Sequence, residues 1–282
     1  MSGHLLICTD LDRTLIPNGP QAESPGARKR FAALVAHPDI SLAYVSGRHR
    51  ALVEQAIEAY SLPVPDFVVG DVGTTIYRVG PAQAWQHDDV WEAKIAADWA
   101  GFSHAALALL LADVAGLRVQ EAEKQNRCKL SYYTPMDADF TALSGLVASR
   151  LGDAGIRCRA ICSIDEEAGC GLLDILPQSA SKLHAIEWLI HGKGFDMAHS
   201  VFCGDSGNDM EVLTSAVPSV LVANASDDIR AQAMQRVAET GHAETLYIAS
   251  GDFMGMNGNY AAGMLQGIAH FHPDTLACMG VS

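Results

Sequence analysis

Two short acidic segments stand out among the residues that could do chemistry. Asp10 and Asp12 follow the apolar run His4–Thr9 and precede a turn that Asn18 and Gly19 favour. Carboxylates two residues apart on an extended backbone point the same way. In a parallel α/β sheet, ligands gather at the carboxyl ends of strands, which is where this pair is expected. Surface turns are also rich in aspartate, so the pair alone does not establish a site.

The second acidic segment covers residues 203–209 and contains Asp205, Asn208 and Asp209. It again follows a predicted strand and opens a predicted helix. Hard oxygen ligands on short loops suit Mg²⁺, whereas the cysteines and histidines show no zinc-ligand spacing. The competing interpretation is a turn that caps the helix.

Two smaller segments could act on a phosphate group. Ser46, Gly47 and Arg48 end a predicted strand and start a predicted helix, so a hydroxyl and amides can bind a phosphoryl oxygen there. Ser46 as a simple helix cap is the competing view. Lys182, at the start of a later helix, could supply a cation to developing negative charge, although a single lysine is usually a solvated surface residue.

Short β-branched runs alternate with amphipathic segments in the first and last thirds of the chain, which predicts one parallel α/β sheet. The strands are expected at His4–Thr9, Ile40–Val45, Asp66–Val69, Ser200–Cys203, Ser219–Ala223 and Thr245–Ile248. The helices are expected at Pro25–Ala36, Arg48–Tyr60, Ser181–His191, Asp209–Ser215, Asp227–Val237 and Tyr260–Phe271.

The middle of the chain has a different pattern, with two strand-helix-strand repeats that indicate a separate insertion. Turn residues at Gly80-Pro81 and Pro177 place its boundaries. The expected fold is α/β, with a Rossmann-like parallel-sheet core at residues 1–80 and 177–282 and an α+β cap domain at residues 81–176. In the cap domain, helices are expected near Val90–Leu111 and Asp137–Leu151, and strands at Arg118–Ala122, Arg127–Tyr133, Gly155–Ile161 and Gly171–Leu176.

Composition narrows the class of protein. The chain has 282 residues, and 49% of them are hydrophobic, which is ample for a buried core. The formal net charge of -14 argues against nucleic acid and anionic membrane as nonspecific partners. No apolar run approaches the roughly 20 residues that span a bilayer. We therefore expect a cytoplasmic globular protein whose cysteines are reduced.

In chain order, the four segments resemble a known family. Asp-x-Asp-x-Thr at 10–14, Ser-Gly-Arg at 46–48, Lys182 and Gly-Asp-x-x-Asn-Asp at 204–209 are similar to the ordered motifs of haloacid dehalogenase-like phosphatases. The resemblance covers the whole chain. The insertion between the second and third motifs looks like the cap of the subgroup that contains sucrose-phosphate phosphatase. Arg13 departs from the family, which usually has a small or polar residue there, such as glycine or asparagine, and its guanidinium could contact substrate or cap.

The resemblance implies a magnesium-dependent phosphatase that works through a phosphorylated Asp10. Asp10, the main-chain carbonyl of Asp12, and Asp205 would hold Mg²⁺, and Asp209 would orient a metal-bound water. Asp12 would be the general acid and base, and Lys182 would bridge Asp10 and the transferring group. The remaining residues implied at the phosphate or the loops around it are Thr14, Ser46, Gly47, Arg48 and Asn208.

Three stretches resemble the sucrose-phosphatase branch, namely residues 129–132, 173–178 and 267–271. They imply that Lys129 and Asp174 contact sugar hydroxyls and that the substrate is sucrose 6-phosphate. Mannosylfructose phosphate and mannosyl- or glucosyl-glycerate or glycerol phosphates are competing substrates. Two competing functions are a mutase that passes phosphate to another acceptor and a catalytically silent sugar-phosphate-binding module. Association with a glycosyltransferase that makes the substrate is a further expectation.

Overall fold

The structure is a computed structural model of the chain, and it describes residues 4–165 and 168–280. The chain divides into two compact units. The first, here called the core unit, comprises residues 1–87 and 182–282, and the second, the inserted unit, comprises residues 88–181. A sheet dominated by parallel strands confirms the predicted α/β class.

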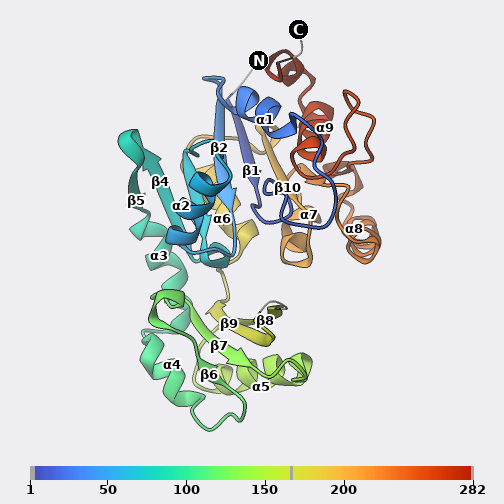
Figure 1. The fold of residues 1–282 in the computed structure, drawn as a ribbon. Coiled ribbons are helices and arrows are strands. Elements are labelled where there is room, and N and C mark those ends of the chain that lie inside the picture. Colours follow the sequence, from blue (N-terminus) through green and yellow to red (C-terminus); the bar gives the residue numbers. More distant parts are fainter. Residues whose placement is uncertain (1–3, 166–167, 281–282) are drawn as a thin grey trace. The chain divides into compact units, whose positions relative to one another are not determined.

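The core unit is built on one eight-stranded sheet in the order β12-β11-β10-β1-β2-β3-β4-β5 (Figure 1). The strands from β12 to β3 pair in parallel, whereas β4 pairs antiparallel with both of its neighbours, β3 and β5. Its strands are β1 (Leu5–Thr9), β2 (Ile40–Val45), β3 (Phe67–Gly70), β4 (Thr75–Gly80), β5 (Ala84–His87), β10 (Ser200–Gly204), β11 (Ser219–Leu221) and β12 (Leu246–Ile248).

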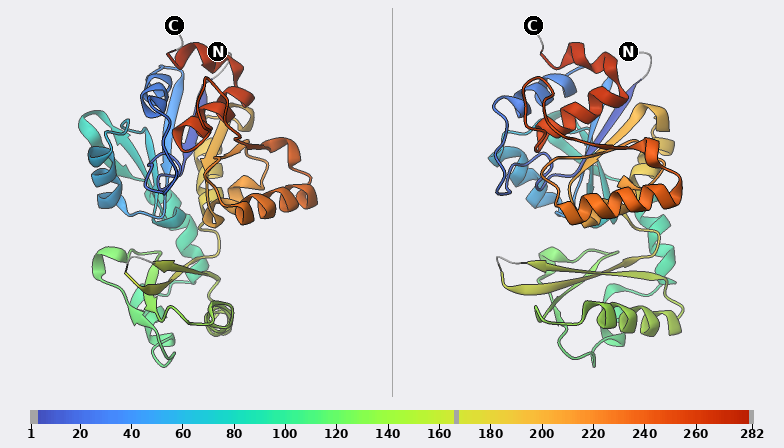
Figure 2. Two further views of the ribbon diagram at one scale, coloured as in Figure 1. Left: turned by 45° about the vertical axis from the view of Figure 1, so that its right-hand side comes forward. Right: turned by 90° about the vertical axis from the view of Figure 1, so that its right-hand side faces the viewer.

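Helices cover both faces of this sheet, as Figures 1 and 2 show. The core helices are α1 (Ala27–Val35), α2 (Arg50–Ala59), α6 (Lys182–Gly192), α7 (Met210–Leu213), α8 (Asp227–Thr240) and α9 (Ala261–Phe271). Side chains of α1, α2 and α9 share one hydrophobic cluster with Leu5, Ile7 and Leu42 of the sheet, whereas α6 and α7 pack against other parts of it. Because β1 is covered on both faces, all five of its residues are buried, as expected for a central parallel strand.

A β-hairpin extends the core sheet beyond the predicted boundary. The prediction places the end of the core at Gly80-Pro81, but Gly80 is the last residue of β4 and Pro81 begins the turn to β5. Pro81 thus ends a strand within the core unit rather than a domain. The chain passes into the inserted unit only after His87, and it returns at Lys182 rather than at Pro177.

The inserted unit is a four-stranded antiparallel sheet in the order β6-β7-β9-β8 with helices packed on one face. The apolar cluster between sheet and helices includes Leu130, Leu173, Leu107 and Val147. The elements are α3 (Asp89–Ala96), α4 (His104–Leu110), β6 (Arg118–Val119), β7 (Leu130–Thr134), α5 (Phe140–Asp153), β8 (Cys158–Asp165) and β9 (Cys170–Pro177).

The single helix predicted over Val90–Leu111 is wrong. Helix α3 ends at Ala96, a short 3-10 turn follows, and α4 starts at His104. Ala100 and Gly101 between them have φ of 50° and 84°, and two left-handed residues in succession break an α-helix.

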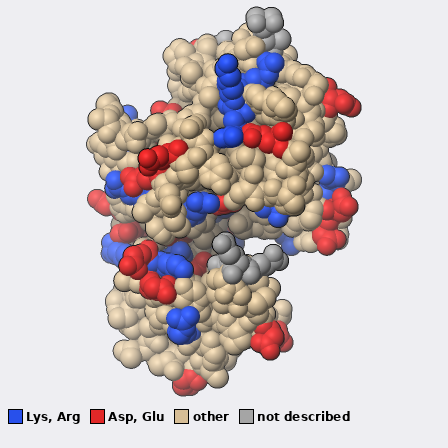
Figure 3. Space-filling view, in the orientation of Figure 1, with Lys and Arg blue, Asp and Glu red and all other residues tan. Residues whose placement is uncertain are grey.

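Three further observations concern the whole described chain. All seven cysteines are free thiols. In residues 4–165 and 168–280, the helices are all too short or too polar to cross a bilayer. On the face that Figure 3 shows, acidic and basic side chains stand in small groups of both signs.

Candidate active site

The predicted acidic segments meet at the carboxyl ends of neighbouring strands. Asp10 follows β1, Asp205 follows β10, and Ser46 follows β2 on the other side of β1. Chain order reverses at β1, because β2 and β3 lie on one side of it and β10 to β12 on the other. Such a switch point in a parallel sheet is where ligands bind.

Asp10 is buried and pairs with a buried lysine. Its Oδ2 lies 3.0 Å from Lys182 Nζ, and its Oδ1 accepts the Leu11 N–H at 2.7 Å. Burial raises the pKa of Asp10 to about 7, although the positive charge of Lys182 opposes the rise. Burial works to lower the pKa of Lys182, but attraction by Asp10 and Asp209 outweighs it, so this pKa lies above its ordinary value. The ammonium also donates to Asn208 Oδ1 at 3.0 Å.

Asp209 organises the second acidic loop from a fully buried position. Its Oδ2 accepts the N–H groups of Asp205 and Ser206 at 3.1 and 3.2 Å, and its Oδ1 accepts from Lys182 Nζ at 2.7 Å. A Cβ at Gly204 would lie 2.6 Å from Asp209 Oδ2, so only glycine permits this approach. The carboxylate also completes a capping box with Ser206. The loop is therefore both the predicted helix cap and part of the charge cluster.

Three buried carboxylates form a potential metal site. Asp10, Asp205 and Asp209 each offer an oxygen, and these atoms lie within 4.8 Å of one another. Burial and the charge of Asp209 raise the pKa of Asp205 to about 6, against the opposing effect of Arg13 and Lys182. When ionised, the three carboxylates carry more negative charge than the buried Lys182 and the half-exposed Arg13 together can balance. Hard oxygen donors with this excess of charge fit Mg²⁺.

Asp12 follows the same strand, but its carboxylate has different partners. Arg48 donates to it through Nε at 2.8 Å and Nη2 at 2.6 Å, and Asn18 Nδ2 donates at 2.7 Å. Burial works to raise the pKa of Asp12, but the Arg48 guanidinium and Asn18 outweigh it, and the pKa lies below its ordinary value. The structure thus gives Arg48 a bidentate carboxylate partner that the sequence did not predict.

Ser46 and Gly47 lie in a bend between β2 and α2. Ser46 is buried and its hydroxyl accepts the Arg48 N–H at 3.2 Å, whereas Gly47 is exposed. The predicted helix start at Arg48 is wrong, because α2 begins at Arg50 with His49 as its N-cap. A phosphate site here would therefore use loop amides rather than the first turn of a helix.

Two side chains of the first loop reach Asp205. The buried Thr14 hydroxyl donates to Asp205 Oδ1 at 3.3 Å. Arg13 Nε lies 3.5 Å from Asp205 Oδ2, and its side chain is 44% exposed. Arg13 therefore places an additional positive charge at the edge of the carboxylate cluster.

The predicted sugar-contacting residues, Lys129 and Asp174, belong to the inserted unit. Asp174 on β9 pairs with Ser131 on β7, and the Ser131 hydroxyl donates to Asp174 Oδ1 at 2.5 Å. Lys129 is buried and precedes Ser131 by two residues. Because Leu130 and Leu173 alternate with these residues and point into the apolar cluster, Ser131 and Asp174 lie on the opposite, polar face of the sheet.

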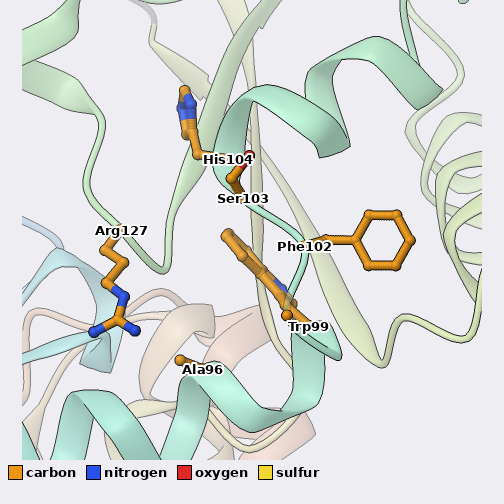
Figure 4. A pocket seen from close by; sticks show the side chains of 7 residues that line it. Ala96, Trp99, Phe102, Ser103, His104 and Arg127 are labelled. Atoms are coloured by element: carbon orange, nitrogen blue, oxygen red, sulfur yellow. The ribbon is translucent and has the colours of Figure 1, made fainter.

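The inserted unit also contains a cavity of about 380 Å³ (Figure 4). Trp99, Phe102, His104 and Arg127 are among the residues that line it. The site residues that we predicted from sequence are not among them.

Three residues that hold the loop after β1 were not predicted from the sequence as part of the site. Asn18 binds the Asp12 carboxylate, Asn224 Nδ2 donates to the Arg13 carbonyl at 2.6 Å, and the Tyr260 N–H donates to Asn224 Oδ1 at 2.8 Å. From the sequence, Asn18 was expected only as a turn former. The position of Asn224 directly after a predicted strand was an available signal, whereas nothing local distinguishes Tyr260.

Comparisons with known proteins add independent information. The family model for sucrose-6F-phosphate phosphohydrolase matches residues 3–272. A protein of Nitrosococcus oceani, named only as a HAD-like hydrolase, is 53% identical over 279 residues, which are 99% of this chain and 75% of that protein. Mannosylfructose-phosphate phosphatase of Agrobacterium fabrum is 30% identical over 231 residues, 82% of this chain and 87% of that one. The fold resembles that of the Synechocystis sucrose-phosphatase solved with sucrose and phosphate, with a TM-score of 0.71 and 24% identity over 95% of this chain and 98% of that one.

Proposed function

The chain belongs to the sucrose-6F-phosphate phosphohydrolase family, and we propose that it releases phosphate from a small sugar phosphate through Asp10. Its membership confirms the predicted haloacid dehalogenase-like phosphatase class. The observation that carries the proposed mechanism is the Asp10–Lys182 pair, at 3.0 Å, beside two further buried carboxylates at the sheet's switch point.

In the first step, a carboxylate oxygen of Asp10 attacks phosphorus and the bond from phosphorus to the sugar oxygen breaks. The departing sugar oxygen takes a proton from Asp12, which acts as general acid. Lys182 balances charge on Asp10 and on the transferring group, and Ser46 and Gly47 hold a phosphoryl oxygen.

In the second step, water attacks the phosphorus of the aspartyl-phosphate and gives a proton to Asp12, and the bond from phosphorus to Asp10 breaks. Inorganic phosphate leaves, and both aspartates return to their starting states. Asp10 and Asp205 would hold Mg²⁺ together with the main-chain carbonyl of Asp12, and Asp209 supports the loop. When bound, the metal would neutralise the phosphoryl oxygens and the nucleophile.

We propose sucrose 6-phosphate as the substrate, with support from the family model that matches most of the chain. Mannosylfructose phosphate is the first alternative substrate, because one relative is named mannosylfructose-phosphate phosphatase. Glycosyl-glycerate and glycosyl-glycerol phosphates are further alternatives. In this proposal Lys129 and Asp174 bind sugar hydroxyls, so a phosphate ester without those hydroxyls leaves both groups without their ligand.

The experiment compares catalytic efficiencies, with Mg²⁺ present, for these sugar phosphates and for 4-nitrophenyl phosphate. Lys129→Ala should lower kcat/KM for the preferred sugar phosphate, by an amount that corresponds to a loss of about 1–3 kcal/mol of transition-state stabilisation. It should hardly change kcat/KM for the aryl ester. Arg150→Ala is a matched control, because Arg150 pairs with Asp113 in the helical layer of the same unit. Equal losses on both substrates would assign Lys129 to the fold instead.

The same assay separates hydrolysis from the two competing functions. A silent sugar-phosphate-binding module would release no phosphate from any ester. A mutase would yield a sugar bisphosphate in place of free phosphate.

Association with a glycosyltransferase remains a prediction, which co-purification with that enzyme would test. We also propose that the protein lies in the cytoplasm, where its seven free thiols would stay reduced.

A further inference from the structure

The loop after Asp10 contains a residue in an unfavourable backbone conformation. Arg13 has a φ of 57°, in the left-handed region that a side chain with a Cβ enters only at a cost in free energy. Asp12, the proposed acid and base, is its direct neighbour. A conformation of this kind persists only where surrounding contacts determine it, so its contacts indicate what the loop is built to hold.

Both main-chain polar groups of Arg13 are bound by side-chain amides. Its N–H donates to Asn18 Oδ1 at 2.8 Å, and its carbonyl accepts from Asn224 Nδ2 at 2.6 Å. Asn18 Nδ2 in turn donates to Asp12 Oδ1. Asn18 therefore links the Arg13 N–H to the carboxylate of Asp12, and Asn224 holds the Arg13 carbonyl on the other side.

Asn224 is itself held in one orientation. It is 3% exposed, and its Oδ1 accepts the N–H of the fully buried Tyr260, so its amide group is fixed with Nδ2 toward the loop. The Tyr260 hydroxyl donates to the Gln21 carbonyl at 3.1 Å. A Cβ at Gly19 would lie 2.8 Å from that hydroxyl, which explains a glycine at this point. Asn224 thus holds segment 13–21 at Arg13, and Tyr260 holds it at Gln21, although both residues lie more than 200 positions away in the chain.

We propose that Asn224 and Tyr260 are positioning residues that fix Asp12 for proton transfer by stabilising the left-handed conformation of Arg13. The inference depends on the proposed acid and base role of Asp12. Without the Asn224 bond, Arg13 relaxes toward the ordinary right-handed region and the adjoining peptide turns, which moves the Asp12 side chain. A proton donor must stay within hydrogen-bond reach of the departing oxygen, so a small displacement reduces its effect.

The first test measures kcat/KM for two leaving groups, because this parameter reports the first phosphoryl transfer. Asn224→Ala should lower it about 10- to 100-fold for the sugar phosphate, part of the ~10²–10⁴-fold that acid-base catalysis supplies. For 4-nitrophenyl phosphate, whose leaving group needs no proton, the loss should be less than about threefold. Tyr260→Phe, which removes one hydroxyl and keeps the ring, should give a smaller loss with the same preference.

Two variants measured in parallel separate the possible failures. Thr275→Val removes a side-chain-to-backbone hydrogen bond of a buried threonine elsewhere in the core unit and should change neither efficiency. Asp12→Asn should show the largest leaving-group preference. If Asp12→Asn loses the same activity on both substrates, the proposed acid role of Asp12 fails. If Asp12→Asn loses more on the sugar phosphate but Asn224→Ala does not, the acid role stands and only the positioning role of Asn224 is overturned.

The second test uses the conformation of residue 13 directly. Glycine adopts the left-handed region freely, so Asn224→Ala should cost much less in an Arg13→Gly background than in the wild type. We expect the loss for the sugar phosphate to shrink to less than about threefold there. An equal loss in both backgrounds would show that Asn224 acts by some route other than the conformation of Arg13. Thermal unfolding of each variant verifies that the rates refer to folded protein.

Discussion

Replacing Asp205 by asparagine should stabilise the metal-free protein, although it removes a proposed metal ligand. Asp205 is 4% exposed and lies in the cluster with Asp10 and Asp209. Burial and the charge of Asp209 raise its pKa from an ordinary 3.8 to about 6. Because the folded state disfavours the ionised form, the protein loses about 3 kcal/mol of unfolding free energy between pH 4 and pH 6, and this loss persists at higher pH.

The sign and size of the effect follow from this difference in pKa. At pH 8 without divalent metal, Asp205→Asn should raise the free energy of unfolding by up to about 3 kcal/mol, because the buried charge is gone. At pH 4 the two proteins should differ little, because the wild-type carboxyl group is protonated there in the folded state. Urea unfolding in the presence of a chelator at both pH values measures this difference.

Asp209→Asn is the matched control, four residues away. The Asp209 carboxylate accepts two backbone N–H groups and a bond from Lys182, so its loss breaks a buried network. It should destabilise the metal-free protein by about 3–5 kcal/mol. Opposite signs for the same chemical change would support the distinction between the two aspartates. A lower stability of Asp205→Asn at pH 8 would refute our account of the charge cluster.

Addition of Mg²⁺ completes this experiment. A metal that binds only the folded state stabilises it by about 2.7 kcal/mol at a hundred times its Kd. Wild-type protein should gain this stability at pH 8, and Asp205→Asn should gain much less, because a ligand and a negative charge are missing. Equal gains would place the metal elsewhere.

Three further predictions concern activity. Asp10→Asn should remain folded and release no detectable phosphate, because the amide lacks the attacking anion, and wild-type turnover would contradict the covalent mechanism. Exhaustive chelation should stop phosphate release and Mg²⁺ should restore it; full activity in chelator would remove the metal from the reaction. Lys182→Met should reduce kcat about 10²–10³-fold and destabilise the fold by about 3–5 kcal/mol, with the exposed Lys193→Met as a control that changes neither.

Much of the fold and the chemical core of the site could be predicted because their signals are local. The apolar run at β1 and the aspartates that follow it are adjacent in sequence, and the same holds for β10 and Asp205. Parallel strands place such neighbours at one edge of a sheet, so the meeting of Asp10 and Asp205 follows from the fold class. Burial of Lys182 could not be predicted in this way, because it depends on Asp10 and Asp209 together.

The parts that escaped prediction depend on contacts between distant residues or on single backbone angles. Strand β5 alternates exposed and half-buried residues at the sheet edge, where the apolar signal is weak. The break after α3 depends on the φ of Ala100, which alanine itself does not favour. Arg13 was recognised as a departure from glycine or asparagine, and its φ of 57° gives the reason, because these two residue types enter the left-handed region most readily.

The return of the chain from the inserted unit has a consequence for how this protein can change over evolution. The unit ends at Ser181, and the next residue is Lys182, the first residue of α6 and the partner of Asp10. Its own apolar cluster makes the insertion a self-contained module, so mutations that alter its polar face can accumulate without unfolding the core. Its two joints differ, however. The chain enters the unit after His87, at the end of a surface hairpin, and this joint tolerates changes in length. One residue gained or lost at 181 would instead rotate Lys182 away from its carboxylates. Recombination between relatives should therefore preserve the joint at 181 and vary the joint at 87.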